Sequence, residues 1–140
     1  MDRFKLRAWN KDLRIMEEVD RSSELYLADS KLYEVYYYNT GNGFDRCDDN
    51  VTDNYDLMQC TGLKGKNEKL IYEGDIIKIK LFESKLYVVK FIDGGYRLIL
   101  CNSKKYFYID ITMLYSKEEC MYEVIGNIYE NFELIKGENT

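Results

Sequence analysis

The feature that most constrains the fold is an alternation of apolar and polar residues with a period of two, which dominates residues 77–101. Successive residues of a β-strand point to opposite faces, so this alternation puts the apolar side chains on one face. The first such strand would bury Ile77, Ile79 and Leu81 and leave Lys78 and Lys80 on the other face. The sequence therefore predicts half-buried strands in this part of the chain.

Turn signals divide the region into short antiparallel strands. Ser84-Lys85 separates the first strand from the second, and Asp93-Gly94-Gly95 is a stronger signal because glycine accepts positive φ. Asn102-Ser103-Lys104 supplies another turn. The result is a meander whose later strands are expected at residues 86–91, 96–101 and 106–109.

The C-terminal part of the chain adds one more strand. Residues 111–119 are ambiguous but could end in one helical turn, and residues 121–125 form the last strand, which Gly126-Asn127 ends. A short segment, residues 128–135, then follows. We expect it to pack back on the sheet through Ile128, Phe132 and Leu134.

The first 56 residues are less regular. They begin with a small hairpin, with strands at 4–9 and 13–16 around a turn at 10–12. The pattern weakens between residues 17 and 30, and a strand at 32–38 follows. Residues 45–50 are interpreted as a solvated acidic loop.

Charge and cysteine content narrow the classes of function. The 140 residues carry a formal net charge of −5, which disfavours a general phosphate-binding surface. The first segment is charged and the apolar runs are short, so we expect neither a signal peptide nor a membrane span. The cysteines form no C-x-x-C pair, which is typical of a reduced cytosolic protein with free thiols at Cys47, Cys60, Cys101 and Cys120.

Catalytic constellations are not found in the sequence. Histidine is absent, which removes the commonest general base and the commonest metal ligand. Glu73-Gly74-Asp75 could be a carboxylate pair, but a turn that feeds a strand is the stronger interpretation. Residues 45–56 have the acidity of a calcium loop without its glycine or its closing glutamate. We therefore predict no catalytic residue, no cofactor and no metal site.

Tyrosine is the one enrichment that could be functional, with 14 in the chain. Exposed aromatic rings can anchor a protein interface or stack on bases, although tyrosine is also a common strand residue. Tyr36, Tyr37 and Tyr38 cannot all point inward, because strand residues alternate. A second candidate surface is basic, and its residues are Lys78, Lys80, Lys85, Lys90 and Arg97.

Four blocks of the sequence resemble the YopX family of small bacteriophage and prophage proteins. They are the start around Trp9, residues 57–77, residues 88–96 and residues 122–131. Asn10 stands where the family usually has Asp, and Phe132 stands where a proline is common. The motif residues with an expected structural role are Trp9, Gly62, Tyr72, Glu73, Gly74, Asp75, Gly94, Gly126 and Asn127.

The resemblance implies a mainly β fold with little helix. Residues 57–136 would form a small antiparallel SH3-like barrel, and residues 1–56 a β extension made of the hairpin and the acidic loop, all within one compact unit. Together with the cysteine usage, the resemblance predicts a location in the cytoplasm of a bacterial host cell. Because the family has no established biochemical role, the resemblance supplies no activity and no catalytic residue, and we expect the protein not to be an enzyme.

The first hypothesis for function is a non-enzymatic accessory protein that binds another macromolecule or itself. A protein partner is favoured over a nucleic acid because the chain is acidic. The alternative is a nucleic-acid-binding small barrel that uses the basic surface, and salt dependence would separate the two. An enzyme ranks third.

Overall fold

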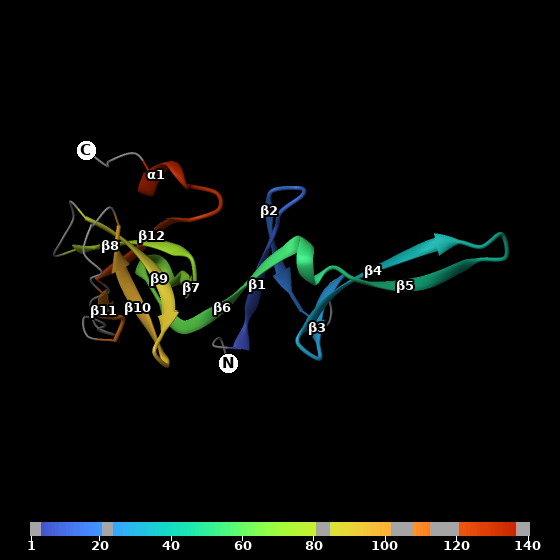
Figure 1. Cartoon of the computed structure of the whole chain (residues 1–140), viewed down its shortest axis with the longest axis horizontal. Helices are drawn as coiled ribbons and strands as arrows, with labels where there is room; N and C mark the ends of the chain where they lie inside the picture. Colours follow the sequence, from blue (N-terminus) through green and yellow to red (C-terminus); the bar gives the residue numbers. More distant parts are fainter. Residues whose placement is uncertain (1–3, 21–23, 81–84, 102–107, 113–120, 137–140) are drawn as a thin grey trace. The chain divides into compact units, whose positions relative to one another are not determined.

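The computed structural model describes residues 4–20, 24–80, 85–101, 108–112 and 121–136 (Figure 1). Within them the chain is mainly β, which confirms the expected fold class, with a short helix, α1 (Glu133–Lys136), and two 3-10 turns. The chain divides into two compact units, Lys5–Met58 and a second unit that comprises residue 4 and residues 59 onward. None of the described helices is long and apolar enough to cross a membrane.

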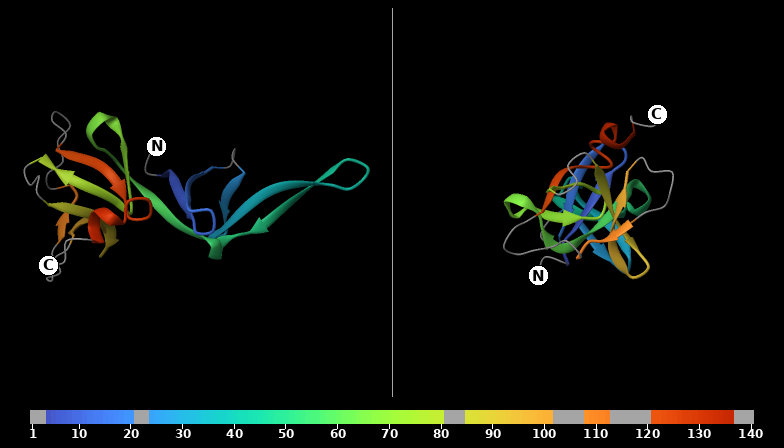
Figure 2. Two further views of the ribbon diagram at one scale, coloured as in Figure 1. Left: turned by 90° about the horizontal axis from the view of Figure 1, so that it is seen from above. Right: turned by 90° about the vertical axis from the view of Figure 1, so that its left-hand side faces the viewer.

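The second unit contains a five-stranded antiparallel sheet with strand order β11-β10-β9-β8-β12, and Figure 2 shows how these strands curl. The curled sheet is compatible with an SH3-like barrel. Its inner face carries an apolar core that includes Ile77, Ile79, Val89, Leu98 and Tyr122. The bounds are β8 (Asp75–Ile79), β9 (Leu86–Ile92), β10 (Gly95–Leu100), β11 (Tyr108–Asp110) and β12 (Tyr122–Asn127).

The turn between β9 and β10 forms where the sequence predicts it. Asp93 and Gly94 both have positive φ, 52° and 80°, and Ile92 lies opposite Gly95 in the register. A two-residue turn with positive φ at both positions twists in the same sense as the strands that it joins. The strands predicted at 86–91, 96–101 and 121–125 are confirmed within a residue or two as β9, β10 and β12.

Some predictions for the second unit need correction. Ile76 is as fully buried as Ile77, although it lies on the same strand face as Lys78, so β8 is not simply half-buried. Lys80 follows the end of β8. Phe132 is 53% exposed and does not pack back on the sheet as expected. Leu81, Ser84, the turn at 102–104, the start of the strand at 106–109 and the helical turn before residue 121 lie outside the described residues.

The first unit begins with a hairpin, as expected, formed by β1 (Leu6–Asn10) and β2 (Ile15–Val19), in which Trp9 lies opposite Met16. The second strand starts two residues later than predicted, because Leu13 and Arg14 belong to the turn. The side chain of Asn10 accepts hydrogen bonds from the backbone N–H groups of Asp12 and Leu13, at 3.0 and 2.9 Å, and so shapes the turn. β1 lies beside β6 (Tyr55–Lys64), a strand that continues into the second unit and pairs there with β7 (Leu70–Tyr72). A small core forms from Ala8, Leu25, Leu32 and Tyr55.

A three-stranded sheet completes the first unit, with order β3-β4-β5. Its strands are β3 (Leu25–Ala28), β4 (Lys31–Asn39) and β5 (Phe44–Asn50). The strand predicted at 32–38 is confirmed as β4. The prediction of an acidic loop at residues 45–50 is wrong, because these residues pair with β4 along their whole length. No strand was predicted between residues 17 and 30, where the end of β2 and all of β3 lie.

Candidate interaction surface

A hairpin arm extends from the first unit, and we define it as residues 35–48 (Figure 1). β3 pairs with β4 only over residues 31–34, so the arm has no third strand beside it among the described residues. The pairing of β4 with β5 runs without a register shift from Tyr33↔Asn50 to Asn39↔Phe44. The backbone N–H of Thr40 donates to the carbonyl of Gly43 at 3.0 Å and closes the tip.

Large aromatic side chains on the arm are exposed to solvent. The exposed fractions are 42%, 62% and 49% for Tyr36, Tyr37 and Tyr38, and 72% for Phe44. The prediction that this tyrosine trio cannot be wholly buried is confirmed. Phe44 was not singled out from the sequence, because it stands among glycines and aspartates without an apolar pattern around it.

One face of the arm combines tyrosines with carboxylates. The register places Glu34, Tyr36 and Tyr38 opposite Asp49, Cys47 and Asp45 in turn. The Cys47 thiol beside the Tyr36 phenol and the nearby charge of Asp49 raise the pKa of Tyr36 to about 12. This face therefore keeps the Tyr36 phenol neutral beside negative charges.

The opposite face of the arm carries an aromatic and ionic cluster near its base. The rings of Tyr26 and Tyr33 stack with centroids 5.5 Å apart, and the Tyr26 hydroxyl donates to Asp48 at 2.5 Å. Arg46 donates through Nε and Nη2 to the two Asp48 oxygens, at 2.7 and 3.0 Å. These bonds from Arg46 and Tyr26 lower the pKa of Asp48, and that carboxylate holds the pKa of Arg46 above its usual value.

The outer edge of β5 presents backbone groups that have no strand to pair with among the described residues. The Thr40–Gly43 bond and the bond from Val51 N–H to Leu32 C=O, 2.8 Å, fix which pairs of this ladder are hydrogen bonded. By alternation, Asp45, Cys47 and Asp49 direct their backbone groups toward β4. The residues whose N–H and C=O point outward are Phe44, Arg46, Asp48 and Asn50.

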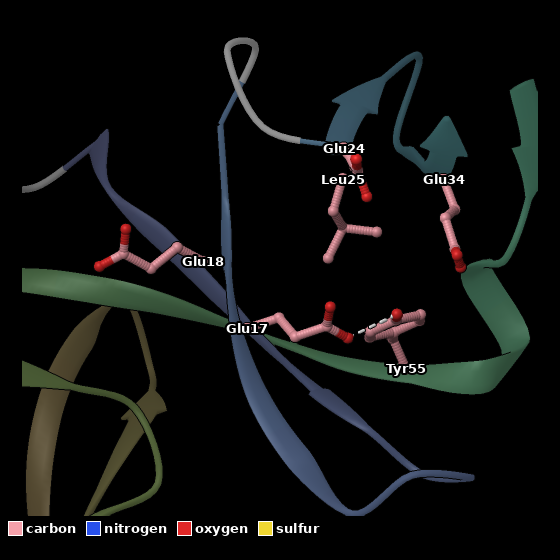
Figure 3. Close-up of a pocket in the computed structure, with 6 residues that line it drawn as sticks. All are labelled: Glu17, Glu18, Glu24, Leu25, Glu34 and Tyr55. Atoms are coloured by element: carbon pink, nitrogen blue, oxygen red, sulfur yellow. Dashed lines mark hydrogen bonds between the residues drawn. The ribbon is translucent and has the colours of Figure 1, made fainter. Parts of the chain in front are cut away.

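An acidic hollow of about 380 Å³ opens in the first unit, lined by Glu17, Glu18, Glu24, Leu25, Glu34 and Tyr55 (Figure 3). In Figure 3 the side chain of Glu17 points toward Tyr55, whereas the side chain of Glu18 points away from Tyr55. Burial and the hydrogen bond to Glu17 raise the pKa of Tyr55, so its hydroxyl remains a donor. The hollow adds negative charge to the unit that carries the arm.

The residues of the predicted basic surface lie on or beside the five-stranded sheet, among acidic residues. Lys90 lies directly opposite Arg97, on the sheet face that also carries Lys78. Asp110 bonds Arg97 at 3.1 Å, and Glu123 lies opposite Lys78. Lys80 and Lys85 are exposed at the ends of strands. The structure therefore interleaves the cations on this face with carboxylates.

Several family-motif residues shape turns. In Glu73-Gly74-Asp75, the Asp75 carboxylate is buried and accepts the N–H of Tyr72 at 2.8 Å, which fits the turn interpretation. Asn127 acts similarly at the other end, where its side-chain oxygen accepts the N–H groups of Tyr129 and Glu130 at 3.0 and 2.9 Å.

The glycines of the motif lie where the backbone or its surroundings leave little room. Gly62 has φ of 84° beside the register shift between Cys60 and Lys64. A Cβ added at Gly126 would lie 2.4 Å from the side-chain oxygen of Asn131. Together with buried Trp9, these residues occupy structural positions.

The thiols differ in their surroundings. Cys60 is fully buried, Cys47 is partly exposed on the arm, and burial raises the pKa of Cys101 to about 11. Among the described residues, no group of three or more Cys, Asp and Glu side chains is placed to hold a metal ion.

Comparison with known proteins identifies a family model and two similar structures. The model described as YopX protein matches residues 5–136. Protein EF1440 from Enterococcus faecalis has a similar structure, with a TM-score of 0.57, 24% identity and coverage of 94% of this chain and 97% of that chain. YopX from Bacillus subtilis also has a similar structure, with a TM-score of 0.57, 24% identity and coverage of 96% of this chain and 99% of that chain. No curated protein sequence matches significantly.

Proposed function

The chain belongs to the YopX family, and we propose that it is a non-enzymatic binding protein that contacts another protein through the β4–β5 arm. The observation that carries this proposal is the exposure of aromatic side chains on a hairpin that no other strand covers among the described residues. Exposed aromatic residues are frequent anchors of protein interfaces, and their exposure in water is unfavourable unless a partner buries them.

A second property of the arm supports a recognition role. In the Tyr26–Asp48–Arg46 cluster, the bond from Tyr26 to Asp48, 2.5 Å, links β3 to β5 at the base of the arm, and Arg46 holds the same carboxylate through bonds of 2.7 and 3.0 Å. Such cross-strand contacts restrict the orientation of the hairpin relative to β3. A surface that is already ordered loses less conformational entropy when it binds.

A protein partner is favoured over a nucleic acid. The arm carries Asp45 and Asp48 against one arginine, Asp49 follows directly at its base, and the arginine is already paired with Asp48. On the sheet of the second unit, acidic residues stand beside Lys78 and Arg97. Phosphate groups bind where cations gather without such neighbours, because neutralisation of phosphates supplies most of the affinity.

The test is site-specific photo-crosslinking in cells that naturally produce the protein. A photoreactive phenylalanine analogue replaces Tyr37 or Phe44 on the arm, and in matched controls it replaces Leu13 or Phe132, which are 68% and 53% exposed. We expect one defined protein to be crosslinked from the arm positions and not from the controls.

The other outcomes are equally informative. Crosslinks only to a second copy of the chain would replace the partner with self-association. Crosslinks to nucleic acid would favour the alternative function. Equal yields from arm and control positions would contradict the proposal, since contact would then follow exposure alone.

A further inference from the structure

We propose that the arm recognises an extended, cationic segment of another protein, which adds as a strand to the outer edge of β5. This inference rests on the proposed function and specifies the chemistry of the partner. Segments bound in this way gain main-chain hydrogen bonds from the edge and specificity from alternate side chains.

The backbone of β5 provides the template for such a strand. Phe44, Arg46, Asp48 and Asn50 direct N–H and C=O groups outward over seven residues without a register shift. Regular, unpaired edges of this length invite pairing, and proteins usually interrupt them with bulges or cover them. Neither device is found on β5 in the part of the chain that the structure describes.

The charges on β5 specify the side chains of the added strand. Asp45 and Asp49 share one face of β5 and lie four residues apart, or about 13 Å along a strand. Cys47 lies between them. An added strand would place side chains opposite each of these positions, and Lys or Arg there would neutralise the two aspartates.

The other face of β5 favours apolar rather than basic side chains on the added strand. Arg46 and Asp48 are already paired with each other, and Phe44 stands 72% exposed beside them. A strand neighbour on this face gains little from a charge and gains hydrophobic contact with Phe44. The segment that fits best therefore alternates basic and apolar residues.

A second copy of β5 fits this edge poorly. In an antiparallel β5–β5 pair the outward residues of one copy must oppose outward residues of the other. The register centred on Cys47 places Asp45 of each copy opposite Asp49 of the other. It also places Arg46 opposite Asp48, but these two are already paired within each copy and gain little from it. The two adjacent registers pair Arg46 with Arg46 or Asp48 with Asp48. Like charges directly opposite are destabilising, which disfavours self-association through this edge.

The test uses defined peptides and the full-length chain. The probe is a nine-residue peptide of alternating Lys and Val with blocked ends, and the comparisons are the Glu-Val peptide of the same pattern and a block peptide of the same Lys and Val content. We expect the alternating Lys-Val peptide to bind at least tenfold more tightly than either comparison, because only it combines the charge with the pattern.

Charge variants of the protein locate the site. The double variant Asp45→Asn with Asp49→Asn removes both carboxylates. We expect it to bind the Lys-Val peptide roughly tenfold more weakly, which is the effect of losing two exposed ion pairs. The matched control is Asp12→Asn with Asp93→Asn, which changes the net charge equally at two exposed turns that are not part of β5. The control should bind like the unmodified protein.

Amide hydrogen exchange tests whether the peptide adds as a strand. In the free protein the amides of Cys47 and Asp49 are bonded to β4, whereas those of Arg46 and Asp48 point outward. Peptide binding should slow exchange at Arg46 and Asp48 by tenfold or more and leave Cys47 and Asp49 little changed. A peptide N-methylated at alternate residues, on the side that faces β5, should lose this effect.

Two results would overturn the inference. One is equal binding of the alternating and block peptides, which would indicate attraction by charge alone. The other is binding without protection of Arg46 and Asp48. Either result leaves the crosslinking test of the proposed function unaffected, so the two failures can be told apart.

Discussion

Tyr55 and Glu17 are joined by a hydrogen bond of 2.6 Å from phenol to carboxylate, which ties the first residue of β6 to the β1–β2 hairpin (Figure 3). Asn10 donates to both partners, at 3.0 Å to the Tyr55 oxygen and 3.1 Å to the Glu17 carboxylate. This network supplies polar contacts inside the first unit, which carries the arm.

Tyr55→Phe should destabilise the first unit by about 1 to 3 kcal/mol, because the bond to Glu17 and the bond from Asn10 are both lost, while Glu17 keeps Asn10 as a donor. Urea denaturation followed by the fluorescence of Trp9, the single tryptophan, measures the effect in this unit. Tyr38→Phe is the control, since its exposed hydroxyl should contribute nearly nothing. Equal effects in the two variants would contradict the role of the network.

Alkaline pH should destabilise the fold through its tyrosines. Burial and Glu17 raise the pKa of Tyr55, and the hydrogen bond to Asp48 raises that of Tyr26, above the ordinary value of 10.0. A raised pKa means that the folded chain holds its protons longer, so this stability is complete below about pH 10 and is lost as the pH rises above it. Urea midpoints measured by circular dichroism should fall above about pH 10 and fall less steeply in Tyr55→Phe.

Acidic pH acts through two aspartates in the opposite sense. Hydrogen bonds from Arg46 and Tyr26 lower the pKa of Asp48 below the ordinary value of 3.8. Hydrogen bonds from Thr112 do the same for Asp110. The stability that they contribute is present above about pH 4 and is lost as the pH falls through their folded-state values. A carbon-detected NMR titration should show that the pKa of Asp48 rises toward 3.8 in Arg46→Gln and does not change in the control Arg14→Gln.

Gly126→Ala should destabilise the second unit by about 1 to 3 kcal/mol, because the new Cβ would meet Asn131 at 2.4 Å. Gly94→Ala should also destabilise the unit, but through backbone strain, because Gly94 has a φ of 80° and no atom lies within 4 Å of the added carbon. Asparagine tolerates positive φ, so Gly94→Asn should recover most of the stability and Gly126→Asn should not. Thermal denaturation of the four variants distinguishes strain from crowding.

Cys47 should be the fastest thiol to react with a disulfide reagent. In a Cys120→Ala background, Cys60 is fully buried and Cys101, with its pKa of about 11, holds only about one thiolate in 10³ at pH 8. Cys47→Ala should therefore remove the fast phase of the reaction, and Cys60→Ala should leave it. A fast phase that survives Cys47→Ala would contradict the described burial.

The second unit was predictable from sequence because its strands have a buried face. Burial of Ile77 and Ile79 imposes the period of two that the sequence displays, and Asp93-Gly94 supplies the φ values that the turn needs. The exposed Phe132 departs from the prediction, because an apolar residue in a short terminal segment has no neighbour pattern that fixes its orientation.

The arm was predictable only in part. β4 carries an aromatic strand signal, but β5 has solvent on both faces and is held by backbone pairing with β4, which leaves no hydrophobic alternation in Asp45–Asn50. Its polar composition therefore looks like a loop. The exposed tyrosines could be inferred from alternation, whereas the Arg46–Asp48–Tyr26 cluster depends on a register between strands distant in sequence.

The most direct test of the central claim compares the affinity of arm and control variants for the protein that the arm crosslinks. Tyr37→Ser with Phe44→Ser removes two exposed rings from the arm, and Leu13→Ser with Phe132→Ser removes two comparably exposed side chains elsewhere. We expect the arm variant to bind at least tenfold more weakly, with an unchanged urea midpoint, and the control to bind like the unmodified protein. Equal affinity in both variants would contradict the assignment of the arm as the binding surface.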